Sequence, residues 1–242
     1  MKKFITLGLA LCTVAISSAQ WGGKKVKGNG DVVTIERSVG DYDAVSLAGW
    51  FDVEIVSGNE GELTLKGESN LLEYIETEVK NGKLVIKTEK GINLKPSNWN
   101  SSIVITVPVE SIDAVSLAGS GDIVGHTTIK TNNFSTNLAG SGDITLEVDA
   151  KSIDASLAGS GDINLSGKTT DFEVSIAGSG DIKAYDLEAE NVKASISGSA
   201  DIRVTANQSI EARVSGSGDI HYRGNPTKIN TKSSGSGDIT KG

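Results

Sequence analysis

Residues 117–123 read Leu-Ala-Gly-Ser-Gly-Asp-Ile, and this stretch returns six more times with little change. The later copies begin at residues 138, 157, 176, 196, 214 and 233, and the last one has lost its leading aliphatic residue. Successive copies place their aspartates 18 to 21 residues apart. A fixed period of this length is typical of a solenoid, in which each repeat forms one coil that stacks on the previous coil.

Between the copies, the apolar residues follow a period of two. Residues 144–148 and 153–157 each carry an aliphatic side chain at every second position, which is the pattern of a strand with one buried face. Turn-forming residues such as Ser166-Gly167-Lys168 separate the strands. The sequence therefore predicts an all-β protein, a parallel β-helix with coils of about 19 residues. Parallel crossovers are strongly right-handed, so we expect a right-handed winding.

The repeated motif places a column of carboxylates along one corner of the stack. The seven aspartates of this column are Asp122, Asp143, Asp162, Asp181, Asp201, Asp219 and Asp238. Two unit charges about 4.8 Å apart repel by roughly 0.9 kcal/mol in water, so the column needs relief. We expect hydrogen bonds from backbone N–H groups of the corner, as in Asx turns. The alternative is a ladder that collects cations, calcium being the ion that favours clustered carboxylates.

The N-terminus has the pattern of a secretory signal peptide. Lys2 and Lys3 precede an apolar run at residues 4–16, and residues 17–19 are small. Residues 1–19 are thus predicted to be removed on export, to the periplasm, the outer-membrane surface or the extracellular space. The single cysteine, Cys12, leaves with this segment, so the mature chain is expected to contain no disulfide.

Charge and composition bear on the partners. Removal of the two signal lysines takes the formal charge from −8 to −10, and an acidic chain is a poor candidate for binding nucleic acid. After the signal no apolar run is long enough to suggest a transmembrane segment. We expect no cofactor and no zinc-type metal centre, because His126 and His221 are several coils apart and no cysteine remains.

The sequence divides the mature chain into a lead-in at residues 20–40, irregular β coils of the same stack at residues 41–115, and the regular β-helix at residues 116–242. Residues 44–55 form a degenerate copy of the motif, in which Trp50 and Phe51 stand where serine and glycine stand later. These two aromatics are expected to cover the first coil rather than stack a ligand. Trp99, in a polar loop, is the candidate for an exposed ligand contact.

The chain resembles the GIN domain, the head domain of autotransporter adhesins, an exported domain common in Bacteroidota and formerly of unknown function. The resemblance is carried by the repeated Ser-Gly-Ser-Gly-Asp-Ile, by Phe51-Asp-Val-Glu-Ile55 and by Gly82-Lys-Leu-Val-Ile86, and it covers about residues 40–240. It implies an exported right-handed β-helix with an adhesin-like role. It supplies no catalytic residues.

Three functions follow as hypotheses. The first is a non-catalytic envelope or surface protein whose repeated face binds a protein or a polysaccharide, because repetition suits multivalent contact. The second is a polysaccharide lyase or glycosidase that uses paired carboxylates of the aspartate column. The third is a scaffold that depends on cations. A homo-oligomer is a further possibility, since the strand edges of a terminal coil are unpaired.

Overall fold

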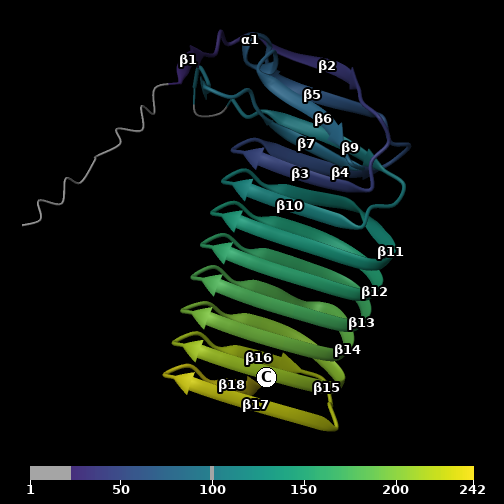
Figure 1. Cartoon of the computed structure of the whole chain (residues 1–242), viewed down its shortest axis with the longest axis vertical. Helices are drawn as coiled ribbons and strands as arrows, with labels where there is room; N and C mark the ends of the chain where they lie inside the picture. The colour runs from purple at the N-terminus through teal and green to yellow at the C-terminus, as the bar shows by residue number, and fades with distance from the viewer. Residues whose placement is uncertain (1–22, 99–100) are drawn as a thin grey trace, which may run out of the picture.

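The stack of coils predicted from the repeat is present in the computed structural model, which describes residues 23–98 and 101–242 (Figure 1). Coils of about 19 residues lie one above another for about seven turns, which confirms the parallel β-solenoid. The predicted signal peptide, residues 1–19, lies outside the described residues.

Five long strands of 15–18 residues form the middle of the regular part; each covers most of one coil and bends on the way, and the strands before and after them are shorter. Its strands are β10 (Ala114–Gly119), β11 (Ile123–Gly140), β12 (Ile144–Gly159), β13 (Ile163–Gly178), β14 (Ile182–Gly198), β15 (Ile202–Gly216), β16 (Ile220–Arg223), β17 (Lys228–Gly235) and β18 (Ile239–Lys241). Each strand pairs in parallel with the strand of the neighbouring coil, and Leu138, Leu157 and Ile176 stand in register. Equivalent side chains of successive repeats therefore stack directly on one another.

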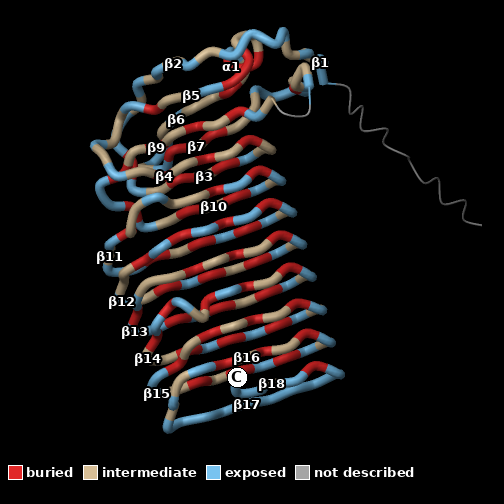
Figure 2. Tube along the Cα trace, turned by 180° about the vertical axis from the view of Figure 1, so that it is seen from behind, coloured by how far each residue is buried: buried red, intermediate tan, exposed pale blue. Residues whose placement is uncertain are grey.

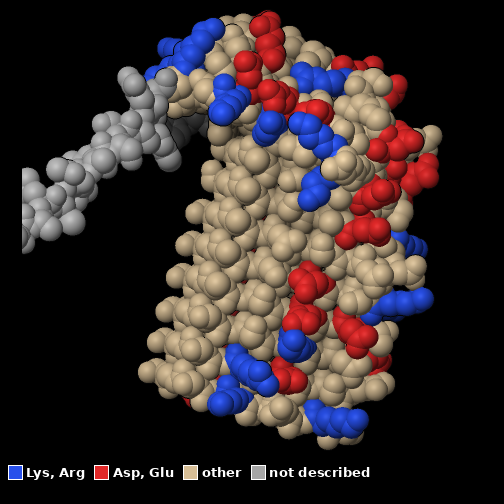
Figure 3. Space-filling view, in the orientation of Figure 1, with Lys and Arg blue, Asp and Glu red and all other residues tan. Residues whose placement is uncertain are grey.

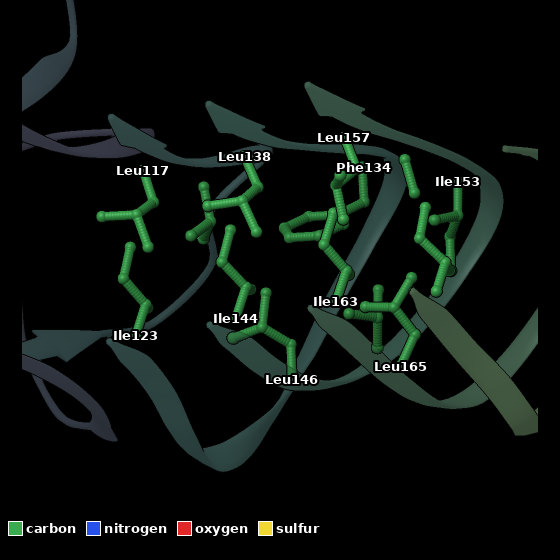
Figure 4. Packing of buried hydrophobic residues seen from close by; sticks show 14 of the residues in the cluster. Leu117, Ile123, Phe134, Leu138, Ile144, Leu146, Ile153, Leu157, Ile163 and Leu165 are labelled. Atoms are coloured by element: carbon green, nitrogen blue, oxygen red, sulfur yellow. The ribbon is translucent and has the colours of Figure 1, made fainter. Parts of the chain in front are cut away.

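The core fills the inside of this flattened tube. Buried and exposed residues alternate along each strand, as the colours in Figure 2 show. In Figure 4, Leu138 and Leu157 lie in one row and face a second row that includes Ile144 and Ile163. These four side chains are all buried, and Phe134 lies between the rows. Burial of such aliphatic side chains is the main favourable contribution to folding, about 1.5–3 kcal/mol for each.

The N-terminal part covers one end of the tube. Its elements are β1 (Lys24–Lys27), β2 (Val32–Ser38), β3 (Ala44–Gly49), β4 (Asp52–Ser57), β5 (Glu62–Glu68), α1 (Ser69–Leu72), β6 (Ile75–Lys80), β7 (Lys83–Thr88), β8 (Ile92–Lys95) and β9 (Val104–Val109). β3 pairs in parallel with β10 on one side and with β7 on the other, so the degenerate copy stacks directly on the first regular copy. The segment between β4 and β10 folds back over the first coil.

Antiparallel pairing ends the stack at this side. β6 runs antiparallel to β7, and β5 runs antiparallel to both β9 and β2. β1 and β8 form a separate two-stranded parallel sheet. The reversal of direction stops the regular stacking of coils, as the atypical end of a solenoid must.

The other end of the stack is open. β17 pairs with β15, and β18 pairs with β16, while all eight residues of β17 are exposed. Ile229, at an inward-facing position of β17, is 53% exposed. The edge of β17 therefore presents backbone groups and one large apolar side chain to the solvent.

One core position holds a polar side chain whose hydroxyl forms no hydrogen bond within the described residues. Thr136 is fully buried, and its hydroxyl has no hydrogen-bond partner among the described residues. Valine occupies the register-equivalent position in the preceding coil, Val115.

We expect Thr136→Val to stabilise the protein by about 1 kcal/mol, because it removes an unsatisfied buried hydroxyl without changing the volume of the side chain. Thermal melting should show a rise of about 2–4 °C, whereas Thr170→Val, at an exposed position, should have little effect. A lower melting temperature for Thr136→Val would contradict this expectation.

Candidate functional site

Two columns of glycine form the sharp corner of the coils. The first column has a positive φ, 148° at Gly140, 153° at Gly159 and 157° at Gly178, a conformation that is essentially limited to glycine. A Cβ on Gly159 would lie 2.0 Å from the carbonyl oxygen of Gly140. In the second column, a Cβ on Gly161 would lie 1.8 Å from the carbonyl oxygen of Gly142. The coils thus stack backbone on backbone at this corner.

The seven predicted aspartates stand together beside these glycines, and backbone bonds join them into a ladder. The backbone N–H of Asp162 donates to Oδ1 of Asp143 at 2.8 Å, and the N–H of Asp143 donates to Oδ1 of Asp122 at 2.9 Å. The same bond joins every later pair as far as Asp238, at 2.8–3.1 Å. We expected the donor to belong to the same corner, but it belongs to the next coil. Each carboxylate that accepts such a bond therefore ties two coils together.

The ladder has an eighth member that the repeat pattern alone did not include. Asp52 of the degenerate copy accepts the N–H of Asp122 at 3.3 Å. The signal was present, since Phe51-Asp52-Val53 aligns with Gly-Asp-Ile of the regular copies. Burial raises the pKa of Asp52, and the neighbouring charges of Asp122 and Glu54 add to this rise, while the N–H bond opposes it.

Basic side chains relieve the charge in the middle of the ladder. Lys183 Nζ lies 2.6 Å from Asp162, and Arg203 lies 3.6 Å from Asp181 and 3.3 Å from Asp201. Burial alone would raise the pKa of Asp162, but the bonds from Lys183 and from the N–H of Asp181 hold it below the usual value. Within the described ranges, no group of three or more His, Cys, Asp or Glu residues is placed to hold a metal ion. A cation ladder therefore remains a proposal.

Substitution of one ladder residue separates a structural role, in which the carboxylate holds two coils together, from a role in cation binding. Asp143→Ala removes the acceptor for the N–H of Asp162, and we expect a loss of about 1 kcal/mol in unfolding free energy. Asp143→Asn keeps an oxygen acceptor and should be almost as stable as the wild type. Urea unfolding of both variants, with and without millimolar calcium, provides the measurement. A calcium-dependent rise in wild-type stability that Asp143→Asn abolishes would instead support the cation ladder.

A broad uncharged surface runs along one side of the coils. We call it the flat face and define it by the outward positions of residues 116–118, 137–139, 156–158, 175–177 and 195–197. Ser156 and Ser175 stand in register, as do Ala139, Ala158 and Ala177. Part of this face forms a hollow of about 490 Å³. Figure 3 shows a continuous region without charged residues here, bordered by charged side chains toward the other edge.

The two aromatics of the degenerate copy have different roles. Phe51 is 1% exposed, and its ring packs over Gly49. Trp50 is only half-buried, and its ring meets that of Phe51 edge-on with centroids 5.8 Å apart. Trp99, the predicted ligand contact, lies outside the described residues.

The histidines do not form a joint site. His126 belongs to β11 and His221 belongs to β16, several coils farther along the stack. The Nδ1 atom of His221 lies 2.8 Å from Oγ1 of Thr240, an exposed neighbour on β18.

The candidate functional surfaces are the aspartate ladder, the flat face and the region around Trp50. In the described part of the chain, no helix has the length and apolar character needed to cross a membrane.

Solved structures share this fold. A putative adhesin from Bacteroides fragilis superposes with a TM-score of 0.80 at 25% sequence identity, over 89% of this chain and 99% of the other. A putative lipid binding protein from Parabacteroides distasonis gives a TM-score of 0.74 at 30% identity, over 90% of this chain and 100% of the other. A putative adhesin from Parabacteroides merdae, at 19% identity and a TM-score of 0.72, over 90% and 99% of the two chains, shares the fold.

None of the curated proteins matches the chain. The names of the three structural neighbours refer to adhesins or to lipid binding, and none of the three refers to an enzyme. A family model, however, covers most of the solenoid. Residues 41–226 match the family described as "Putative auto-transporter adhesin, head GIN domain", and the chain belongs to that family.

Proposed function

We propose that this protein is exported and acts as a non-catalytic, adhesin-like binding protein of the cell surface or envelope, with the flat face as its contact surface. The observation that carries the proposal is the repetition of small uncharged side chains in register over five coils. The family and the adhesin names of the structural neighbours support the binding role. Residues 1–19 have a basic start, an apolar run and then small residues, as a secretory signal peptide does, and this order supports export.

The geometry of the flat face suits an extended partner with its own repeat. Successive coils lie about 4.8 Å apart, so the same group is offered again at each step. Weak contacts of this kind add up along a partner that engages several coils at once. Serine and alanine lose little side-chain entropy on contact and let a partner approach the backbone closely. A polysaccharide or an extended protein segment meets these conditions.

The test is binding of the labelled mature protein to intact bacterial cells and to a panel of immobilised neutral polysaccharides. Ala158→Lys places a long charged side chain at an exposed position of the flat face, and we expect it to weaken binding about tenfold or more. The matched control is Asn164→Lys, on the opposite side of the same coil, which should bind like the wild type. Equal binding by both variants would contradict the proposed surface.

Two further results bear on the same proposal. Protection of the protein from protease and antibody on intact cells would place it in the periplasm and remove a direct role in cell adhesion. New reducing ends or unsaturated products from a polysaccharide would favour the alternative of an enzyme, provided they vanish in the Asp143→Asn and Asp162→Asn double variant.

We also infer that a second copy of the chain binds at the exposed edge of β17. The supporting observation is Ile229, which is 53% exposed on a strand with one free edge. We expect light scattering to show a dimer that Ile229→Lys converts to a monomer. Val32→Lys, at an equally exposed valine on the opposite end of the rod, should leave the dimer intact. A wild-type monomer at all concentrations would contradict the contact.

A further inference from the structure

The N-terminal end of the rod has a cavity that belongs to no repeat. It has a volume of about 620 Å³, within the range of small-molecule sites. We call it the corner pocket, and its lining includes Lys27, Trp50, Lys95, Pro96, Ser97 and Ser101. The flat face shares none of these residues, so a ligand in the corner pocket goes beyond the proposed function and does not depend on it.

Trp50 is the departure from the repeat that creates the apolar wall of the pocket. In the next coil, Ser120 takes its place and its backbone N–H donates to the carbonyl of Gly49 at 3.0 Å. Phe51 is buried in the core, whereas Trp50 is only partly buried and packs against the core from outside. The edge contact with the ring of Phe51 supports the indole on one side. The part of the indole that the core leaves exposed is available to a planar ligand.

Two lysines bring a concentrated positive charge to the same pocket. β1 and β8 pair in parallel with Lys27 directly opposite Lys95, and like charges in this arrangement destabilise a strand pair. Neither ammonium group forms an ion pair with any carboxylate of residues 23–98 or 101–242. An anionic ligand group between the two side chains would convert this repulsion into attraction.

The backbone around both lysines is held in place before any ligand arrives. Asn70 Nδ2 donates to the carbonyl oxygen of Lys27 at 2.8 Å, and the N–H of Gly28 donates to the carbonyl oxygen of Lys95 at 2.8 Å. The buried carboxylate of Glu68 accepts the N–H of Ser97 at 2.8 Å. A pocket that is organised in advance spends less of its binding energy on ordering its own walls.

An apolar aromatic surface, two ammonium groups and serine hydroxyls together match one class of ligand. We propose that the corner pocket binds an acidic saccharide, with the apolar face of a hexuronate ring on Trp50 and its carboxylate between Lys27 and Lys95. Ser97 and Ser101 line the same pocket, and their hydroxyls, which also bond to Glu68, can accept hydrogen bonds from the sugar hydroxyls. A neutral sugar would leave the two lysines without a counter-charge, so the pocket selects for the acid.

The test is titration of the full mature chain with tetragalacturonate, followed by calorimetry and tryptophan fluorescence at low salt. We expect saturable binding, and a fluorescence change that Trp50→Phe removes. Lys27→Gln and Lys95→Gln should each weaken binding about tenfold, as expected for loss of a charge-assisted contact. Both lysines are exposed, so these variants keep the fold. Lys151→Gln, an exposed lysine in the regular part of the rod, is the matched control.

Three outcomes would overturn the proposal. They are equal affinity for maltotetraose, which lacks carboxylates; binding to phosphatidylglycerol vesicles without binding to tetragalacturonate; and lysine variants that bind tetragalacturonate like the wild type. Ala158→Lys, on the flat face, should leave tetragalacturonate binding unchanged. Failure of the corner pocket and failure of the flat face are therefore seen in separate measurements.

Discussion

Gly159→Ala should lower the unfolding free energy of the solenoid by about 3 kcal/mol or more. The new Cβ would lie 2.0 Å from the carbonyl oxygen of Gly140, and the φ of 153° is one that alanine rarely adopts. The clash is with backbone of the preceding coil, so relief requires the two coils to separate and their hydrogen bonds to lengthen. For a domain of this size, the loss corresponds to a fall in melting temperature of about 6–12 °C, measurable by circular dichroism.

Two other glycines provide matched controls for this substitution. Gly161→Ala affects the second column, in which the chain already has Ala200 at the equivalent position, so we expect a smaller loss. A Cβ on Gly40 would meet no atom within 4 Å, and Gly40→Ala should be neutral. Melting of Gly159→Ala within a degree or so of the Gly40→Ala variant would show that backbone contact at the corner does not limit stability.

Glu68→Gln is expected to have the second-largest effect, a loss of about 2–3 kcal/mol at neutral pH. Glu68 is 2% exposed, and its two carboxylate oxygens accept the N–H groups of Gly30 and Ser97. A glutamine amide offers only one oxygen, so its NH2 group would face a backbone donor. Urea unfolding gives the difference, with Glu62→Gln, exposed at the other end of β5, as the control.

The effect of Glu68 should also depend on pH. Burial alone would raise the pKa of Glu68, but the hydrogen bonds from Ser97 and Gly30 outweigh burial and hold the pKa below its ordinary value. Because the folded-state pKa is lowered, the stabilisation is present in full above the unfolded pKa of about 4.3 and is lost as the pH falls through the folded value. The gap between wild type and Glu68→Gln should therefore narrow in acid. A gap that stays constant between pH 7 and pH 3 would contradict this assignment.

Most of the fold could be predicted from the sequence, because one period is repeated seven times. Each copy specifies the same inward positions and the same glycine corner, so a departure in a single copy does not obscure the pattern. The partner of each aspartate was harder to predict, because Asp162 and Asp143 are 19 residues apart and meet only once the coils are in register. Asp52 could be identified from the degenerate copy, where Phe51-Asp52-Val53 aligns with Gly-Asp-Ile, but its bond to Asp122 spans 70 residues.

The corner pocket had no comparable signal in the sequence. It depends on the pairing of β1 with β8, two four-residue strands that are distant in the chain and occur once. Neither strand has a period, a capping motif or a turn signature that would bring Lys27 to Lys95. The sequence predicts that Trp50 and Phe51 cover the first coil, but side-chain packing decides which of the two is buried.

The ladder of aspartates has a consequence for a solenoid with a different number of coils. Every joint between coils uses the same bond, and the joint from Asp52 to Asp122 uses it across 70 residues of chain. A rod with one coil more or one coil fewer would keep each joint chemically the same. Such a rod would also keep the same antiparallel pairing at its N-terminal end.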